Sequence, residues 1–458
     1  MQLPGLSVGI VADDLTGACD TALQFFSSHA KTHVLLDFQS FGQAEPSPAQ
    51  LQENQVWSIN TGTRHTPALE AQALVRQAVS LGRDRLGIEN FYKKIDSTLR
   101  GNIAQECLGM LEEMKAQCAV IAPAYPQEGR RTVGGYQLVR GVPVEKVMGR
   151  DPLCPVRQSH LPTLLEQHSK PELVGHIALS QVLHGAGPIL VKLNELIKEG
   201  KKLVVIDATS TEDLEQIALA IEKAQKNAKV LPCGSAGLAQ ALADLWAVEP
   251  EESTVVPLFK KKSNLSIAAS PILIVSGSNT DITRQQVLRL IDNYAYYGQG
   301  SQLEIFDLPA DQVLGLSPVE ETINRIVAAL GDRNTVVLST ALKEEAYQRT
   351  LSLAAEHHIS EAQASQKAQE LLARITAEVS RQKTVKLILT GGETTCEVCQ
   401  QLNIQELELI AEADESIPLC MDGQGRWIVT KSGGFGTPLA LANVIKFIKQ
   451  RESTSVHA

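Results

Sequence analysis

Val8-Gly9-Ile10-Val11-Ala12-Asp13-Asp14-Leu15-Thr16-Gly17 is the most informative run in this chain of 458 residues. Its first half is a short apolar run that predicts a buried strand, and its second half is a polar turn before a helical pattern. The same order of strand, turn and helix recurs in both halves of the chain. This alternation is typical of parallel sheets covered by helices, so the sequence predicts an α/β protein.

Short runs rich in β-branched and aliphatic residues mark the predicted strands. They cover residues 8–12, 34–37, 91–95, 119–122, 203–207, 271–275, 335–339, 386–389 and 427–430. Helical periodicity fills much of the remaining sequence. The pattern therefore predicts largely parallel sheets with flanking helices.

The length of the chain predicts two domains, because a single hydrophobic core stops growing well below 458 residues. Residues 249–270 lack a clear period and contain Pro250, Pro257 and three consecutive lysines, which indicates a linker. The predicted domains are residues 1–248 and 271–458. We expect the active site in the cleft between them.

The composition limits the classes of partner. The chain has 42 Lys and Arg against 52 Asp and Glu, and its formal net charge of -10 opposes binding to nucleic acid or to anionic membranes. Its 8 cysteines lack the spacing of a disulfide framework, and no run reaches the length of a membrane span, so a cytoplasmic protein is expected. Cys396 and Cys399 form a lone C-x-x-C within a predicted helix, and no metal site is expected.

The C-terminal half contains three turns of small residues, each after a predicted strand and before a helix. They are residues 276–279, 390–395 and 431–436. Glycine lets the backbone approach a ligand closely, and helix N-termini attract anions, so we interpret these turns as phosphate-binding. In the third turn, we expect Lys431 to supply a mobile positive charge, Thr437 to be the N-cap and Pro438 the first helical residue. Tight strand-to-helix packing is the alternative for each turn alone, and no Walker A or G-x-G-x-x-G fingerprint accompanies them.

In the N-terminal half, the turns after strands carry charge instead of glycine. Asp13 and Asp14 follow the first strand, and one of them is expected to bind substrate hydroxyls or to act as general base. The alternative is that Asp14 or Thr16 only caps the next helix. Asp96 and Arg100 follow a later strand, and a structural ion pair is the alternative to a catalytic role. Arg64 lies in a polar turn, where its fork could clasp a substrate carboxylate.

Together these segments resemble the four-carbon acid sugar kinase family, whose members phosphorylate threonate, erythronate or 3-oxo-tetronate. The resemblance covers nearly the whole chain and rests on segments 11–17 (VADDLTG), 94–102 (KIDSTLRGN), 123–126 (PAYP), 390–394 (TGGET) and 431–436 (KSGGFG). It implies an N-terminal sugar-acid domain and a C-terminal nucleotide domain.

The resemblance also implies site residues in each domain. For the sugar acid these are Asp13, Asp14, Arg64, Lys94, Ile95, Asp96, Ser97 and Arg100. For ATP they are Ser276, Gly277, Ser278, Gly391, Gly392, Glu393, Thr394, Lys431, Ser432, Gly433 and Gly434. The role of Arg130 and Arg131 stays open.

The implied reaction moves the γ-phosphoryl group of ATP to a terminal hydroxyl of the acid, with Mg²⁺ neutralising the phosphates. Asp14 or Asp96 would act as the base, and the sequence does not rank them. A phosphatase of the haloacid dehalogenase type and a non-catalytic sugar-acid sensor are the alternatives. The sequence does not identify which acid is used, and a homodimer is only the default expectation.

Overall fold

The computed structural model describes residues 7–26, 30–41, 55–149, 151, 154–246, 267–277 and 280–454. The chain forms two compact units, Met1–Leu258 and Phe259–Ala458. Most of the predicted linker, residues 249–266, and the predicted site residue Ser278 lie outside the described residues. The predicted domain bounds and the predicted cleft therefore stay predictions.

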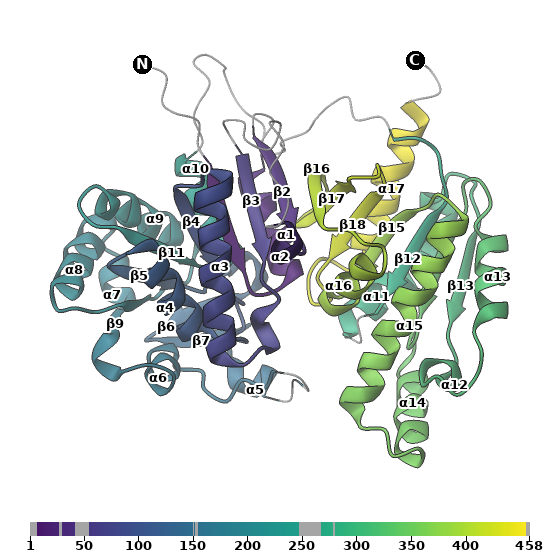
Figure 1. Ribbon diagram of the computed structural model, residues 1–458, viewed down its shortest axis with the longest axis horizontal. Coiled ribbons are helices and arrows are strands. Elements are labelled where there is room, and N and C mark those ends of the chain that lie inside the picture. The colour runs from purple at the N-terminus through teal and green to yellow at the C-terminus, as the bar shows by residue number, and fades with distance from the viewer. Residues whose placement is uncertain are drawn as a thin grey trace. The chain divides into compact units, whose positions relative to one another are not determined.

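The N-terminal unit is built on a parallel sheet with the strand order β2-β3-β1-β4-β11-β5-β10-β9 (Figure 1). The strands are β1 Val8–Ala12, β2 Lys31–Leu35, β3 Gln55–Asn60, β4 Asn90–Lys94, β5 Cys118–Ala122, β9 Val174–Ile177, β10 Leu203–Ile206 and β11 Val230–Gly234. The helices are α1 Leu15–Phe25, α2 Phe38–Phe41, α3 Ala68–Leu86, α4 Ile103–Met114, α5 Val144–Met148, α6 Leu161–Gln167, α7 Leu179–Val182, α8 Ala186–Lys198, α9 Thr211–Gln225 and α10 Ala236–Trp246.

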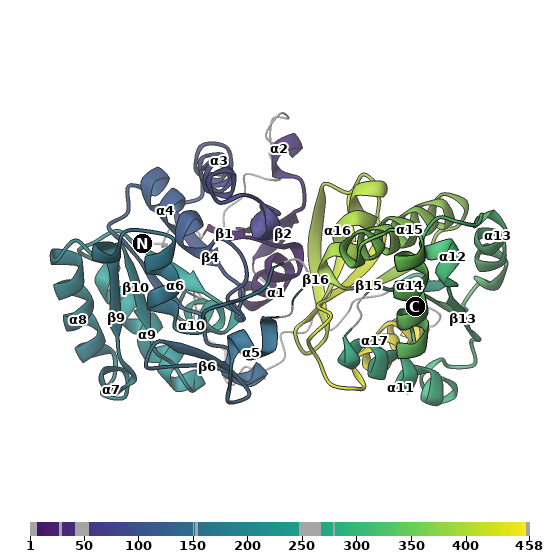
Figure 2. The same ribbon diagram turned by 90° about the horizontal axis from the view of Figure 1, so that it is seen from below.

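Two apolar cores lie on the two faces of this sheet, because successive side chains of a strand point to opposite faces. In β1, Val11 belongs to the core beneath α3, α4 and α6, whereas Val8 and Ile10 belong to the core beneath α1, α8, α9 and α10 (Figure 2). In β4, Phe91 belongs to the first of these cores and Tyr92 to the second. The alternation leaves only the strand ends and their turns free to carry polar function.

A small antiparallel sheet in the N-terminal unit consists of β6 Arg130–Val133, β7 Tyr136–Val139 and β8 Val142–Pro143. Asp207, a fully buried residue just after β10, holds the turn between β6 and β7 in place. The Asp207 carboxylate accepts from the backbone N–H groups of Gly134 and Gly135 at 2.7 and 2.9 Å and contacts His176 Nε2 at 2.9 Å. These contacts of Asp207 fix the β6–β7 hairpin beside the end of β10.

The C-terminal unit has the strand order β13-β14-β12-β15-β18-β17-β16, parallel from β13 to β18 and antiparallel beyond. Its strands are β12 Ile272–Ser276, β13 Leu303–Asp307, β14 Thr335–Ser339, β15 Lys386–Thr390, β16 Glu406–Asp414, β17 Ile417–Asp422 and β18 Trp427–Lys431. Its helices are α11 Asp281–Tyr297, α12 Ala310–Val313, α13 Glu320–Ala329, α14 Glu344–Glu356, α15 Glu361–Gln382, α16 Gly392–Gln401 and α17 Ala440–Thr454. Helices α11 and α17 share one core with the sheet, and α15 and α16 lie on its other face (Figure 2).

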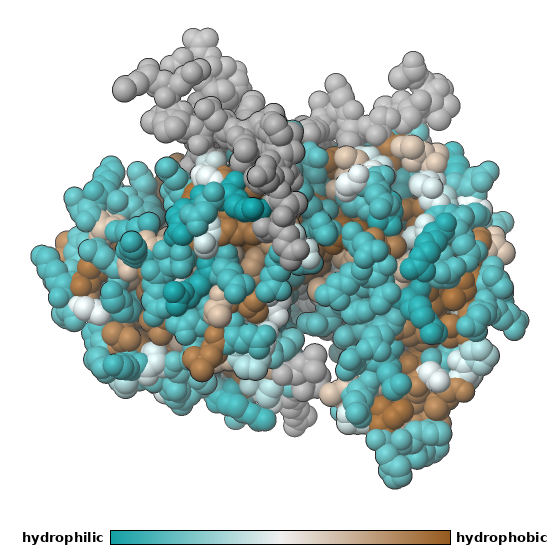
Figure 3. All heavy atoms as spheres, viewed as in Figure 1, coloured by the Kyte–Doolittle hydropathy of each residue, from teal (hydrophilic) through white to brown (hydrophobic). Residues whose placement is uncertain are grey.

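The structure confirms the predicted α/β class, and the predicted strands differ from the observed ones by a few residues at most. The start of the last helix is a correction. Thr437 and Pro438 precede the helix instead of capping and opening it, because α17 begins at Ala440 after a turn in which Ala440 N donates to Thr437 O. Among the described helices, none combines the length and the apolar composition that a membrane crossing requires. The face in Figure 3 is mainly hydrophilic, with apolar side chains in small separate groups.

Candidate functional site

The parallel register of the N-terminal sheet brings three polar turns together. Ala12 at the end of β1 is paired with Asn60 on β3 and with Lys94 on β4. The residues that follow these strands therefore meet at one edge of the sheet, the edge where ligands bind in open α/β folds. This edge carries the predicted acid-binding residues, from Asp13 to Arg100, on three segments far apart in the sequence.

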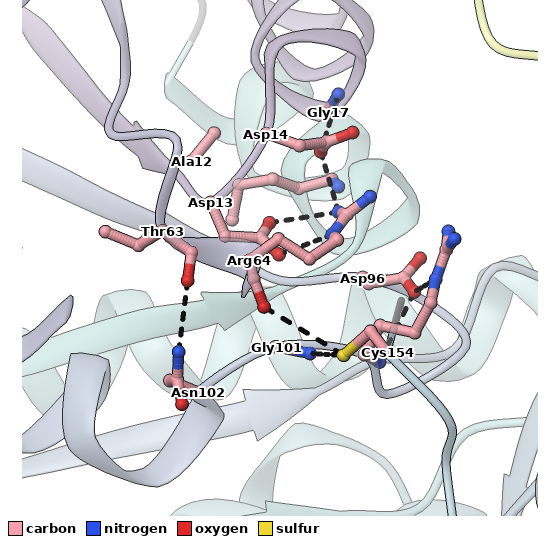
Figure 4. A network of polar contacts seen from close by, with 12 residues as sticks. Ala12, Asp13, Asp14, Gly17, Thr63, Arg64, Asp96, Gly101, Asn102 and Cys154 are labelled. Atoms are coloured by element: carbon pink, nitrogen blue, oxygen red, sulfur yellow. Dashed lines mark hydrogen bonds and ion pairs between the residues drawn. The ribbon is translucent and has the colours of Figure 1, made fainter. Parts of the chain in front are cut away.

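Arg64 is held between the two aspartates that follow β1 (Figure 4). Its Nε and Nη2 donate to the two carboxylate oxygens of Asp13, and Nη2 also donates to Asp14 Oδ1 at 2.7 Å. Burial alone would lower the pKa of Arg64, but the attraction of Asp13 and Asp14 raises it well above its usual value. The Nε–Nη2 edge is thus occupied by Asp13, and Arg64 fixes the positions of both aspartates.

Asp14 caps the first helix, as the more modest interpretation of the sequence predicted. Its Oδ1 accepts from the N–H of Gly17 at 3.0 Å, and its Oδ2 accepts from the hydroxyl of Thr16 at 2.6 Å. Burial raises the pKa of Asp14, but the nearby charges of Arg64 and Lys94 outweigh it and lower the value below 3.8. Asp14 is therefore an ionised carboxylate whose oxygens already have partners.

Asp96 differs from Asp14 in how its two oxygens are used. Thr98 Oγ1, Arg100 Nε and Arg100 N all donate to Asp96 Oδ2, at 2.5, 2.6 and 3.3 Å. Among the described residues, no hydrogen bond reaches Oδ1. Burial raises the pKa of Asp96, but attraction to Arg100 and Arg64 outweighs it and holds the value well below 3.8. The predicted ion pair exists, and it leaves one carboxylate oxygen available.

Lys93 and Lys94 point to opposite faces of β4. Lys93 is fully buried beneath α4, where its Nζ lies 2.6 Å from Glu106 Oε2 and donates to the carbonyls of Val11 and Lys94. The Lys94 ammonium lies on the α1 side, where a Cβ at Gly17 would come within 2.7 Å of it. Lys93 is thus structural, and Lys94 is the lysine that lies with the aspartates.

The predicted residues Ile95 and Ser97 occupy different environments. The Ile95 side chain belongs to the apolar core below α4, so only its backbone lies at the site. The carbonyl of Ser97 accepts from Gln137 Nε2 at 2.7 Å, and Thr132 Oγ1 donates to Gln137 Oε1 at 2.7 Å. The small sheet therefore positions the turn after β4, a role that the sequence did not indicate.

Two other residues of this site were not predicted from the sequence. Asp151 Oδ2 lies 3.3 Å from Arg100 Nη1. Cys154 Sγ accepts from the N–H of Gly101 at 3.3 Å (Figure 4). Arg130, whose role was left open, pairs with Glu128 at 3.0 Å. No sequence motif surrounds Asp151 or Cys154, so only the fold reveals them.

Asp20 is a second buried carboxylate near this site, one turn beyond Gly17 on α1. Its side chain is 6% exposed, and its Oδ1 has no hydrogen-bond partner among the described residues. Burial raises the pKa of Asp20 to about 7, against the opposing attraction of Lys94. Near neutral pH, this group therefore changes charge in the folded protein.

The C-terminal unit brings its three small-residue turns together in the same way. Ser276 on β12 is paired with Thr390 on β15, and Thr390 is paired with Lys431 on β18. Gly391 has a φ of 95°, a conformation that favours glycine, and α16 begins directly after it. The first amides of α16 lack partners within the helix and can receive an anion.

The glycines of these turns also allow close packing between them. A side chain at Gly277 would collide with Thr394, which is 1% exposed in the first turn of α16. Lys431 differs from the expectation of a mobile cation: it is 1% exposed, and its Nζ donates to the carbonyl of Ser432 at 2.7 Å. Lys431 is held in the interior, and the solvent-accessible part of this turn is Ser432 and the glycines after it, which are half-buried.

Residues of α11 that the sequence analysis missed hold the turn after β18. Thr280, which is the N-cap of α11, and Thr283 and Gln286 within the helix all donate to its backbone carbonyls. Their signal in the sequence is a spacing of three residues, which places polar side chains on one face of a helix. Among the described residues, no group of three His, Cys, Asp or Glu side chains could hold a metal ion.

Comparisons with known proteins match both units. Residues 8–242 match the sugar-binding N-terminal domain family and residues 273–441 the nucleotide-binding C-terminal domain family. The chain is 29% identical to a D-threonate kinase of Salmonella typhimurium, over 96% of this chain and 98% of the relative. It is 30% identical to a D-erythronate kinase of Heliobacterium modesticaldum, over 98% of this chain and 99% of the relative.

A solved structure of a Haemophilus influenzae protein shares the fold, with a TM-score of 0.69 at 22% identity over 96% of this chain and 100% of that one. The resemblance seen in the motifs thus extends through both units. The chain belongs to the four-carbon acid sugar kinase family.

Proposed function

We propose that this protein transfers the γ-phosphoryl group of MgATP to a terminal hydroxyl of a four-carbon sugar acid. The observation that carries the proposal is the network in which Arg64 orders Asp13 and Asp14 beside Asp96, at the ligand-binding edge of the sugar-binding unit. Phosphoryl transfer needs little covalent chemistry from the protein, so ordered charges and donors supply most of the catalysis.

Asp96 is the proposed acceptor of the proton from the attacking hydroxyl. Its Oδ1 has no hydrogen bond from a described residue, whereas Asp14 has partners on both oxygens. A carboxylate of low pKa suits a reaction whose nucleophile loses its proton late. Arg100 fixes the position of Asp96, and Lys94 supplies a positive charge for the substrate carboxylate.

The nucleotide is proposed to bind at the three turns of the C-terminal unit, with its phosphates on the amides of α16 and of the turn after β18. Mg²⁺ arrives with the nucleotide as part of the substrate, since it keeps several waters and binds mainly through phosphate oxygens. The matched family of residues 273–441 supports a nucleotide site in this unit.

The two alternatives fit the structure less well. In a haloacid dehalogenase-type phosphatase, the first aspartate attacks phosphate, but here both oxygens of Asp13 accept from Arg64. A non-catalytic sensor does not need a second unit with nucleotide-type turns. Release of phosphate without ATP would favour the first alternative, and binding of acid without turnover would favour the second.

The test is ADP release from MgATP with D-threonate, D-erythronate and 3-oxo-tetronate, using threitol as the control that lacks the carboxylate and gluconate as the longer acid. We expect turnover with at least one four-carbon acid and none with threitol. Equal turnover with threitol would contradict acid recognition, and no turnover with any acid would contradict the substrate class.

A further inference from the structure

The turn after β18 is attached to α11 through its carbonyl groups. Gly433 O accepts from Thr283 Oγ1 at 2.9 Å and from Thr280 Oγ1 at 2.5 Å. Gln286 Nε2 donates to Phe435 O at 3.1 Å and to Thr437 O at 2.9 Å. Thr283 and Gln286 are fully buried, so these bonds form in a region shielded from water.

The orientation of the Gln286 amide follows from its partners. Both partners are carbonyl oxygens, which only accept, so the NH₂ group must face them. The Oε1 atom is then left without a hydrogen-bond partner among the described residues. A buried polar atom without a partner costs stability. Both hydrogen bonds that Gln286 makes thus go to carbonyls of one turn, and fixing that turn is the role that its contacts indicate.

Fixing these carbonyls also fixes the N–H groups of the turn. In a trans peptide, the C=O of one residue and the N–H of the next point in opposite directions. With the carbonyls of Gly433 and Phe435 directed at α11, the N–H groups of Gly434 and Gly436 point away from α11. Within the described residues, neither N–H donates a backbone hydrogen bond.

We propose that Thr283 and Gln286 are positioning residues for nucleotide binding, and that they aim the N–H groups of Gly434 and Gly436 at a phosphate group. The inference rests on the proposed function and adds Gly436 to the ATP-binding residues that the resemblance implies, which end at Gly434 in this turn. Gly436 has a φ of 87°, and a Cβ there would lie 3.3 Å from Gln286 Nε2, so both conformation and packing favour glycine.

The experiment compares Thr283→Val, Thr283→Ser, Gln286→Leu and a control, Thr376→Val, in the full-length protein. Thr376 is fully buried on α15 and donates to Leu372 O at 2.6 Å, so the control removes a similar bond far from the turn in sequence. Each variant is measured for ATP affinity, sugar-acid affinity, melting temperature and hydrogen exchange of the amides of residues 433–436.

We expect Thr283→Val and Gln286→Leu each to weaken ATP binding about tenfold, the equivalent of one lost hydrogen bond. In both variants, the amides of residues 433–436 should exchange faster than in the wild-type protein, and the affinity for the sugar acid should stay within about twofold of the wild-type value. Thr283→Ser keeps the hydroxyl and should bind ATP like the wild type. Thr376→Val should lower the melting temperature without changing either affinity.

Unchanged ATP affinity and exchange in Thr283→Val and Gln286→Leu would overturn the positioning role alone. An equal loss of ATP affinity and sugar-acid affinity in Thr283→Val and Gln286→Leu, or a loss of ATP affinity in Thr376→Val as large as theirs, would show a purely structural effect and would also overturn it. If the wild-type protein binds no ATP, the proposed function itself fails, and the positioning role fails with it.

Discussion

Arg64 makes a bidentate interaction with the carboxylate of Asp13, through hydrogen bonds of 2.8 and 3.1 Å, although the two residues are 51 positions apart in the sequence. The pairing of β1 with β3 makes this contact possible, since it places the two turns side by side. A guanidinium can bind a carboxylate in this bidentate way and an ammonium cannot, because only the planar guanidinium presents two aligned N–H groups.

Arg64→Lys should therefore damage catalysis while keeping the charge. We expect kcat/KM for the sugar acid to fall about a hundredfold, which corresponds to about 2.7 kcal/mol, with the KM for ATP unchanged. Steady-state kinetics on both substrates measure this. Arg76→Lys is the control, because Arg76 is half-exposed on α3. A variant with wild-type kcat/KM would show that the fork is dispensable.

Asp96→Asn and Asp14→Asn should separate the two candidate bases. We expect Asp96→Asn to lower kcat by about 10² to 10⁴, as loss of a general base does. Asp14→Asn should mainly raise the KM for the acid, because it weakens the pair with Arg64. It should also cost up to about 1 kcal/mol of stability through the weakened cap. The opposite ranking in kcat would assign the base to Asp14.

The buried pair of Lys93 and Glu106 should be important for stability. Glu106→Gln leaves the fully buried Lys93 without its counter-charge, and we expect a loss of about 3–5 kcal/mol in the free energy of unfolding. Glu112→Gln on the same helix breaks the exposed pair with Arg76 and should cost at most about 1 kcal/mol. Urea denaturation compares the two, and equal losses would show that burial does not matter here.

Asp20 should make stability depend on pH. The unfolded chain loses this proton near 3.8, and the folded protein keeps it until about 7. Between these values the folded state binds more protons, so the free energy of unfolding falls as pH rises. The stability that the protonated Asp20 contributes below pH 4 is on the order of 4 kcal/mol, and it is lost by the time the pH has risen above about 7.

Asp20→Asn cannot ionise, so its free energy of unfolding should fall less than that of the wild-type protein between pH 5 and pH 8. Glu89→Gln, which removes an exposed carboxylate of the same unit, should behave like the wild type. Parallel pH profiles for Asp20→Asn and the wild type would contradict the raised pKa of Asp20.

The sequence predicted much of the fold, because local patterns govern the strands and the turns after them. The runs 8–12 and 335–339 match β1 and β14 residue for residue. The start of α17 was missed because Thr437 and Pro438 form a good local signal for a helix start. The bonds from Gln286 to the carbonyls of Phe435 and Thr437 hold these residues in the turn instead.

Site residues that belong to a local motif could be predicted from the sequence. Residues whose position depends on tertiary contacts could not. Asp13, Asp14 and Asp96 follow strands directly, so their position at the ligand-binding edge could be inferred. Lys431 is the last residue of a strand, and its burial depends on packing that no local pattern records. Gln137 acts through the Ser97 carbonyl, a contact between residues 40 positions apart.

Phosphorus NMR of the wild-type protein with MgATP and each four-carbon acid tests the proposed reaction most directly, since it detects ADP and the new phosphate ester together. We predict that a phosphomonoester signal grows in step with ADP for at least one acid, and that Asp96→Asn suppresses both signals. Growth of inorganic phosphate without an ester, or no change with any of the acids, would contradict a sugar-acid kinase.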